Sequence, residues 1–168
     1  MKQTKRTVRG SGFGKALPRL IFGTAMALSL SLTVVYAQLD FRHTVTGALL
    51  DVPASAAKTP AAKEFFKTGK NPYNGDKEAL KKGETQYATS CGGCHGHVGE
   101  GKLGPGLADN YWTYPKNKTD KGLFETIWGG AQAMMGPQES FMTVDEMLLT
   151  MAWVRELGEQ GKSAKGGH

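Results

Sequence analysis

The segment Cys91-Gly92-Gly93-Cys94-His95 constrains this chain more than any other, because it contains both of the chain's cysteines. Cys-x-x-Cys-His is the attachment signature of c-type haem. Two thiols on one turn can each add to a vinyl group of the same porphyrin, and the histidine that follows can present its imidazole to the iron. With both cysteines used in this way, no thiol remains for a disulfide. The motif predicts one covalently bound haem c with His95 as the proximal iron ligand.

Two other interpretations of the motif must be weighed against haem attachment. A thioredoxin-like redox site requires a βαβ context, whereas this motif follows a helical pattern in a chain without alternating strand patterns. A zinc site requires further Cys or His ligands at close spacing. Only His97 lies nearby, and the chain holds no third cysteine. Both interpretations are therefore disfavoured.

The formal net charge of +6 is confined to the N-terminus. Residues 1–37 hold six of the 21 basic residues and none of the 15 acidic ones, so residues 38–168 hold 15 of each sign. A basic chain invites a nucleic-acid or acidic-membrane interpretation only when its charge lies on the folded domain. The charge distribution therefore argues against a nucleic-acid partner.

The N-terminus has the pattern of an export signal. A basic stretch that ends at Arg19 precedes an apolar run, Leu20 to Val35, and Ala37 provides a small residue for cleavage before Gln38. The run is shorter than the roughly 20 residues that span a bilayer comfortably. We expect a signal peptide over 1–37 and a periplasmic mature chain; the alternative is an uncleaved anchor helix.

The remaining chain predicts a helical protein. A short helix is expected over 60–68, and a longer one over 77–89 after Asp76, a good N-cap. A third helix is expected over 121–128, stopped by two glycines. The last begins after Thr143 with a capping box to Glu146 and closes at Gly158 or Gly161. Residues 38–76, which are rich in turn formers, are expected to be loosely ordered, and the tail 162–168 to be flexible.

A haem iron held by His95 needs an opposite ligand or an open site. Methionine sulfur raises the reduction potential and suits an electron carrier. Met134 and Met135 lie in a Gly-rich loop stopped by Pro137, and such a loop can bring backbone close to a flat cofactor. Met147 and Met151 lie on the apolar face of the last helix, where methionine is more often core. The remaining candidates downstream are His97, Met142 and His168.

The order of these features resembles the class I cytochromes c, over about residues 76–157. Gly83 and Tyr87 resemble the family's first-helix pair, which packs against an aromatic side chain of the last helix, here Trp153. Gly104-Pro105-Gly106-Leu107 resembles the loop whose proline carbonyl accepts the proximal histidine N–H. The resemblance implies an all-α class I cytochrome c fold, with a cytochrome c domain over 76–161 and an N-terminal extension, 38–75, that wraps the core.

Longer strings are similar to the cytochrome cL family, the periplasmic electron acceptors of quinoprotein methanol dehydrogenases in methylotrophic bacteria. They include Cys94-His-Gly-His97, Tyr111-Trp-Thr-Tyr-Pro115, Met135-Gly-Pro137 and Thr150-Met-Ala-Trp-Val-Arg155. The family resemblance implies Met135 as the sixth iron ligand, whereas ordinary class I spacing after Ile127-x-x-Gly130 selects Met134.

The same resemblance implies further site residues and partners. Trp112 and Tyr114 carry N–H and O–H donors that suit haem propionates, although packing across the haem edge is an equal alternative. A calcium ion near the propionates is implied only weakly, because the chain has no Asp-x-Asp-x-Asp loop. The implied partners are a PQQ-dependent methanol dehydrogenase of the calcium or lanthanide type, and a downstream cytochrome c or oxidase.

We therefore expect a monomeric monohaem electron carrier rather than an enzyme. Two alternatives belong to other classes. One is a haem enzyme or gas sensor with an open iron site, and the other is a membrane-tethered oxidase subunit that retains its N-terminal helix. Carbon monoxide binding would favour the first alternative, and the mass of the mature protein would decide the second.

Overall fold

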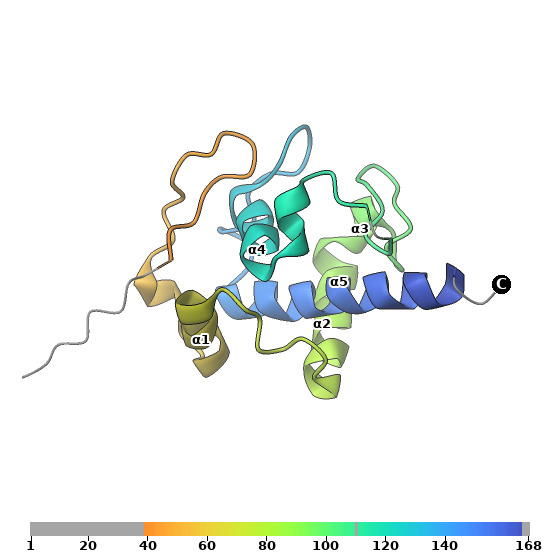
Figure 1. Ribbon diagram of the computed structural model, residues 1–168, viewed down its shortest axis with the longest axis horizontal. Coiled ribbons are helices and arrows are strands. Elements are labelled where there is room, and N and C mark those ends of the chain that lie inside the picture. Colours follow the sequence, from red (N-terminus) through yellow and green to blue (C-terminus); the bar gives the residue numbers. More distant parts are fainter. Residues whose placement is uncertain (1–38, 110, 166–168) are drawn as a thin grey trace, which may run out of the picture. The chain divides into compact units, whose positions relative to one another are not determined.

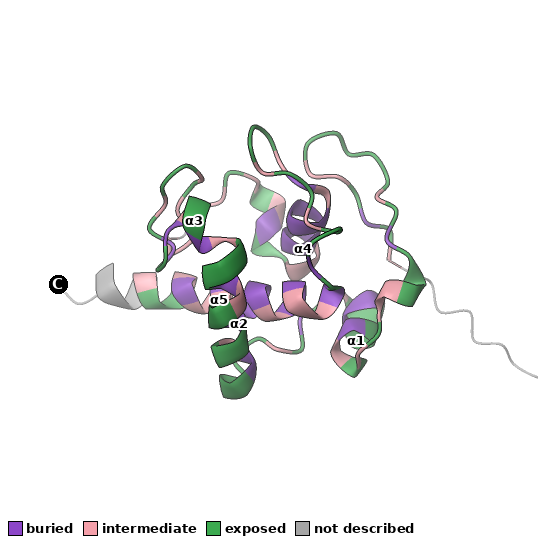
Figure 2. Cartoon of the chain, turned by 180° about the vertical axis from the view of Figure 1, so that it is seen from behind, coloured by how far each residue is buried: buried purple, intermediate pink, exposed green. Residues whose placement is uncertain are grey.

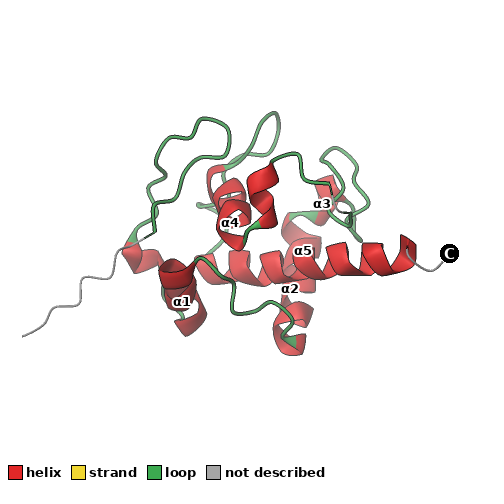
Figure 3. Cartoon of the chain, viewed as in Figure 1, coloured by secondary structure: helices red, strands yellow, loops and turns green. Residues whose placement is uncertain are grey.

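The computed structural model describes residues 39–109 and 111–165, so the predicted signal peptide lies outside the described residues. This part of the chain is helical and contains no strand, as predicted (Figures 1 and 3). A single antiparallel bridge joins Arg42 to Leu49. The described elements, in chain order, are η1 (Ala54–Ala56), α1 (Pro60–Thr68), α2 (Lys77–Ser90), α3 (Gly92–His95), η2 (Pro115–Lys118), α4 (Asp120–Gly129) and α5 (Val144–Lys165).

Side-chain caps start the helices where the sequence predicts them. The Thr59 hydroxyl accepts a hydrogen bond from Ala62 N at the start of α1, and the Asp76 carboxylate accepts one from Ala79 N at the start of α2. Thr119 caps α4 in the same way through Gly122 N. Each cap satisfies an amide that has no partner inside its helix.

Helix α5 begins with the predicted capping box. Thr143 N donates to Glu146 Oε2 at 2.8 Å, and Glu146 N donates to Thr143 Oγ1 at 3.3 Å. The helix does not close at Gly158 or Gly161 but continues to Lys165. A Cβ at Gly161 would lie 1.8 Å from Ala108 O, so this glycine stands inside the helix at a point where a neighbouring loop approaches closely. No helix within 39–109 or 111–165 has the length and apolar character to cross a bilayer.

Helices α2 and α5 cross at a glycine (Figure 1). A Cβ at Gly83 would lie 2.2 Å from Leu149 O and 3.2 Å from Trp153 Cβ. One turn later on α2, Tyr87 is fully buried. The predicted approach of Gly83 to Trp153 is therefore present, and the crossing positions the end of α2 from which the cysteine motif continues.

The N-terminal segment is more ordered than its composition predicts. Phe41 is 2 % exposed and packs against three aromatic side chains, with ring centroids 5.1 Å from Phe124, 5.5 Å from Phe66 and 6.1 Å from Phe65. Figure 2 shows the buried faces of α1 and α4 that this cluster joins. Turn propensities depend only on neighbouring residues. They therefore do not predict that an aromatic side chain is buried among partners far along the chain.

A buried carboxylate ties the same segment to α4. Glu125 is 2 % exposed, and its side chain forms ion pairs with Lys116, at 2.5 Å, and with Lys121. Arg42 N donates to Glu125 Oε1 at 2.7 Å. Burial alone would raise the pKa of Glu125, but the hydrogen bonds from Lys116, Lys121 and Arg42 N hold that pKa below its ordinary value.

Candidate haem-binding site

The two cysteines and His95 are arranged by a single helical turn. Cys91 ends α2, donating its N–H to Tyr87 O at 2.8 Å, and begins α3. The N–H groups of Cys94 and His95 both return to Cys91 O, at 3.1 and 2.9 Å. Residues three and four apart share one side of a helix, so both thiols and the imidazole belong to the same turn. Cys91 is half-buried and Cys94 exposed.

The loop that follows α3 closes on His95. Gly101 N donates to His95 O at 2.8 Å, and Gly104 N donates to Cys94 O at 2.9 Å. His95 Nδ1 lies 2.8 Å from Pro105 O. A carbonyl only accepts, so Nδ1 carries the proton and Nε2 keeps its lone pair for a metal. The predicted contact between Pro105 and His95 is thus present in the structure.

Glycine at position 104 is needed for this closure. A Cβ there would lie 2.7 Å from His95 Cε1 and 2.9 Å from His95 Nδ1. Any side chain at this position would push the loop or the imidazole away. Two thiols with the spacing of haem attachment, beside an imidazole that is held in one orientation, are the donor set that haem c requires. The residues present therefore fit this group.

Cys91 of the motif and the neighbouring Tyr87 have raised pKa values. Burial, followed by the proximity of Cys94, raises the pKa of the Cys91 thiol to about 11. Burial also raises the pKa of Tyr87 to about 12, and its hydroxyl donates to Gly96 O at 2.8 Å. Both side chains are neutral at physiological pH. The neutral phenol of Tyr87 links α2 to the residue that ends α3.

The loop that contains Met134 and Met135, residues 130–137, is called the methionine loop here. It follows α4 and turns at Gly130. Gly130 has φ +78°, and a Cβ there would lie 2.7 Å from Met135 O. Ala131 N donates to Met135 O at 2.9 Å, which closes the loop on itself. Met134 is 75 % exposed, whereas Met135 is half-buried and packs against the core. The two candidate ligands thus have opposite environments.

The other candidate ligands lie elsewhere in the molecule. Met147 and Met151 are fully buried in α5, and Met142 is buried just before it. His97 is exposed on the loop after α3, with its ring near Gly92. His168 lies outside the described residues. Within the described part of the chain, no three His, Cys, Asp or Glu side chains gather as a metal site, so the structure supplies no such cluster for calcium.

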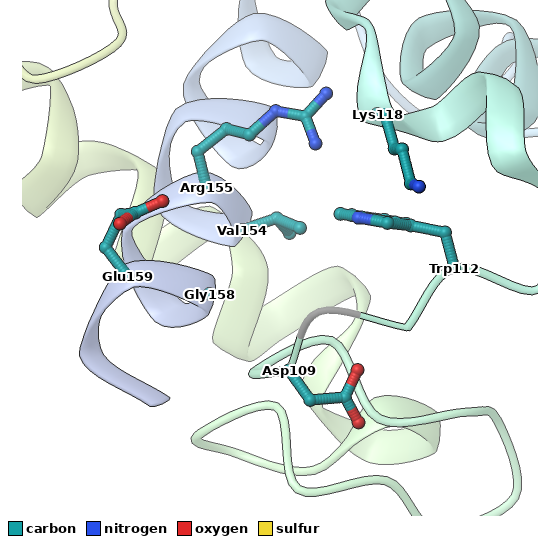
Figure 4. Close-up of a pocket in the computed structure, with 7 residues that line it drawn as sticks. All are labelled: Asp109, Trp112, Lys118, Val154, Arg155, Gly158 and Glu159. Atoms are coloured by element: carbon teal, nitrogen blue, oxygen red, sulfur yellow. The ribbon is translucent and has the colours of Figure 1, made fainter. Parts of the chain in front are cut away.

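Trp112 and Tyr114 lie on the segment before η2 and take different positions. The Arg155 guanidinium carbon lies 5.2 Å above the Trp112 ring centroid, at a cavity of about 390 Å³ (Figure 4). The cavity is lined by Asp109, Trp112, Lys118, Val154, Arg155, Gly158 and Glu159. The Tyr114 hydroxyl instead reaches the methionine loop, where it accepts from Gln132 N at 3.2 Å. Sequence patterns gave no signal for either contact.

A family model described as cytochrome c oxidase, cbb3-type, subunit III, matches residues 78–154, which run from α2 to α5. This range contains the cysteine motif, the loop that holds His95 and the methionine loop. Helices in this order around a Cys-x-x-Cys-His turn define a class I c-type cytochrome, as the sequence predicted.

The chain is 60 % identical over 120 residues to cytochrome c-L of Methylorubrum extorquens. The matched region covers 70 % of this chain and 61 % of that protein. A crystal structure of cytochrome cL from Hyphomicrobium denitrificans is 57 % identical, with a TM-score of 0.68, and covers 71 % of this chain and 73 % of the other. A crystal structure of cytochrome cL from Methylophaga aminisulfidivorans is 51 % identical, with a TM-score of 0.67. It covers 78 % of this chain and 94 % of the other. The chain belongs to the cytochrome cL family.

Family membership confirms two predictions. The chain has the all-α class I cytochrome c fold, and it belongs to a family of c-type cytochromes, which are haem c proteins. The chain spans 61 % of the length of the curated relative it matches.

Proposed function

We propose that this protein carries single electrons from a PQQ-dependent methanol dehydrogenase to a downstream cytochrome c or oxidase in the periplasm. The observation that supports this most directly is the Cys-x-x-Cys-His turn itself: its His95 is oriented by Pro105, and Cys91 and Met135 pack against the same hydrophobic core, in a chain of the cytochrome cL family. A bound haem supplies one-electron chemistry by alternating between ferric and ferrous iron. The chain's own residues hold, orient and bury it.

We propose that Cys91 and Cys94 would bind one haem covalently and that His95 and Met135 would ligate its iron. The half-buried position of Met135 supports this choice over Met134, which is 75 % exposed. In this proposal Trp112 and Tyr114 line the propionate edge. The ferric Met135→Ala protein should lose the near-infrared charge-transfer band of His/Met ligation and bind carbon monoxide when reduced. The matched Met134→Ala protein should keep the band; the reverse result would make Met134 the ligand.

The partner is tested by stopped-flow reduction of the oxidised protein with methanol dehydrogenases of the calcium and lanthanide types. Leu103 is 73 % exposed on the loop that closes over His95, and we propose that it belongs to the docking face. Leu103→Asp should slow reduction by the dehydrogenase, because a charge replaces apolar contact area. Leu49→Asp, at a residue 65 % exposed on the N-terminal segment, is the control. Equal rates for both variants would contradict this docking face.

The proposal also includes the cleavage of a signal peptide, the boundaries of the segments and the bound groups of the mature protein. We propose a signal peptide over 1–37, an extension over 38–75, a cytochrome c domain over 76–161 and a tail over 162–168. The mature protein should be monomeric and should have the mass of residues 38–168 plus one haem. Metal analysis of that protein, before and after chelation, tests for the calcium ion.

The match to an oxidase subunit model favours one second candidate, a membrane-tethered oxidase subunit. This alternative requires that residues 1–37 stay attached. A native mass that includes them, together with recovery in the membrane fraction, would favour the tethered subunit over the soluble carrier.

A further inference from the structure

Helix η2 is held rigidly between α4 and α5. Its buried residue Asn117 accepts a hydrogen bond from Thr126 Oγ1 of α4 at 2.7 Å, through its side-chain oxygen. The main-chain oxygen of Asn117 accepts from Arg155 Nη2 of α5 at 2.8 Å. A Cβ at Gly122 would lie 2.0 Å from Lys116 O, so η2 and α4 are in close backbone contact. These contacts fix the position of η2 against α4 and α5, and η2 is called the η2 platform below.

Tyr114 stands at the start of this platform. Its carbonyl accepts from Asn117 N at 2.9 Å, and the residue is half-buried. Its hydroxyl oxygen accepts from Gln132 N, 18 residues further along the chain, at 3.2 Å. Among the described residues, the other main-chain hydrogen bonds of the methionine loop stay within it or return to α4. The Tyr114 contact is thus the loop's hydrogen bond to the η2 platform.

The loop needs such support because its backbone is strained. Ala133 has φ +63°, the left-handed region that non-glycine residues adopt only under backbone strain. Gly136 N also donates a hydrogen bond to Met134 O at 3.1 Å. The chain therefore turns tightly on both sides of the two methionines. A strained loop with few outside contacts opens at low free energy.

We propose that Tyr114 is a positioning residue for the sixth ligand: its hydroxyl holds Gln132 N–H and so keeps the methionine loop closed, with Met135 at the iron. The inference rests on the proposed ligation by Met135. It adds a second role to the propionate-edge position proposed for Tyr114, and this role belongs to the hydroxyl oxygen that accepts from Gln132 N. The coupling runs from Arg155 through Asn117 and η2 to Tyr114, and from there to Gln132 and Met135.

The test is the affinity of the ferric holoprotein for imidazole, which must displace methionine to bind. Tyr114→Phe removes the acceptor oxygen and leaves the ring in place. Imidazole affinity should rise about three- to tenfold, the effect of one ordinary hydrogen bond. Tyr111→Phe is the matched control, because this tyrosine, three residues away, is 72 % exposed. Its affinity for imidazole should equal that of the wild type.

Two further results decide the inference. In the wild-type ferrous protein, the Gln132 amide should be protected from hydrogen exchange, and Tyr114→Phe should remove that protection. An unprotected Gln132 amide, or an imidazole affinity in Tyr114→Phe equal to that in Tyr111→Phe, would overturn the role of Tyr114. A wild-type protein without the His/Met near-infrared band would instead overturn methionine ligation itself, so the two failures are distinguishable.

Discussion

Gly83 sets the distance between α2 and α5, because its missing side chain lets the Leu149 carbonyl approach. Gly158 lies on the same long helix, α5, but meets nothing closer than 3.9 Å at its virtual Cβ. The two glycines therefore have different consequences when alanine replaces them, although both lie inside helices.

We expect Gly83→Ala to destabilise the holoprotein by about 1–3 kcal/mol, because the new methyl group forces the two helices apart. Gly158→Ala should be neutral or stabilising by up to about 1 kcal/mol, because alanine favours a helix interior. Denaturant unfolding measures both values. Equal destabilisation by both substitutions would show that the crossing tolerates a wider separation.

The ionisation of Glu125 contributes to stability, because it is a buried carboxylate with two lysine partners. Its folded-state pKa is depressed, so its contribution is present above the unfolded pKa and is lost as pH falls through the folded value.

Glu125→Gln should therefore cost about 3 kcal/mol at pH 7, since it leaves two lysine ammonium groups without their buried partner. The difference from the wild type should shrink as pH falls from the ordinary glutamate pKa toward the lower folded-state value, because the wild-type carboxylate then becomes protonated as well. Glu78→Gln, which breaks an exposed pair with Lys81, should have little effect. Unfolding free energies measured from pH 3 to 7 test this; a difference independent of pH would contradict it.

At the scale of elements, the segment before α1 packs as part of the core. Phe41 inserts between α1 and α4, and Thr44 Oγ1 lies 2.7 Å from Thr126 Oγ1. The Thr59 hydroxyl, which caps α1, also donates to Asp145 of α5 at 2.5 Å. The proposed extension is thus joined to both α4 and α5.

Phe41→Ala should destabilise the protein by about 3–5 kcal/mol, because it empties a fully packed aromatic site. Leu49→Ala, on the same segment but 65 % exposed, should change stability by less than about 0.5 kcal/mol. Thermal unfolding of the two holoproteins measures this difference. A small effect of Phe41→Ala would mean that the segment lies on the core without contributing to it.

At the scale of the whole molecule, the net charge of residues 38–168 differs from that of the full chain. The full chain has a pI of about 9.3, but residues 38–168 hold equal numbers of acidic and basic residues. Haem adds two propionates, which are ionised at neutral pH. Association with a partner must then depend on local charge and apolar contact more than on net attraction.

The mature holoprotein should focus below pH 7, and it should carry one haem. Isoelectric focusing of the purified native protein, with its mass, makes the measurement. A pI near 9 would show that the basic residues before Gln38 remain attached, and would contradict the proposed cleavage.

Local rules account for what could be predicted from the chain alone. Asp76 and Thr143 start helices because a short side-chain acceptor satisfies the first free amides. The cysteine motif specifies its chemistry because haem attachment needs two thiols and an imidazole on one turn. These features depend on residues within a few positions of one another, and the sequence by itself determined them.

Only the tertiary structure decided the features that depend on distant neighbours. It turned Met135 toward the core and Met134 toward solvent, buried Glu125 between lysines, and drew Phe41 into an aromatic cluster. It also showed Gly161 as a point of close approach within a helix rather than its end, and joined Tyr114 to Gln132. Each of these contacts joins segments far apart in sequence, and burial and steric fit between such segments follow from packing, which no local pattern encodes.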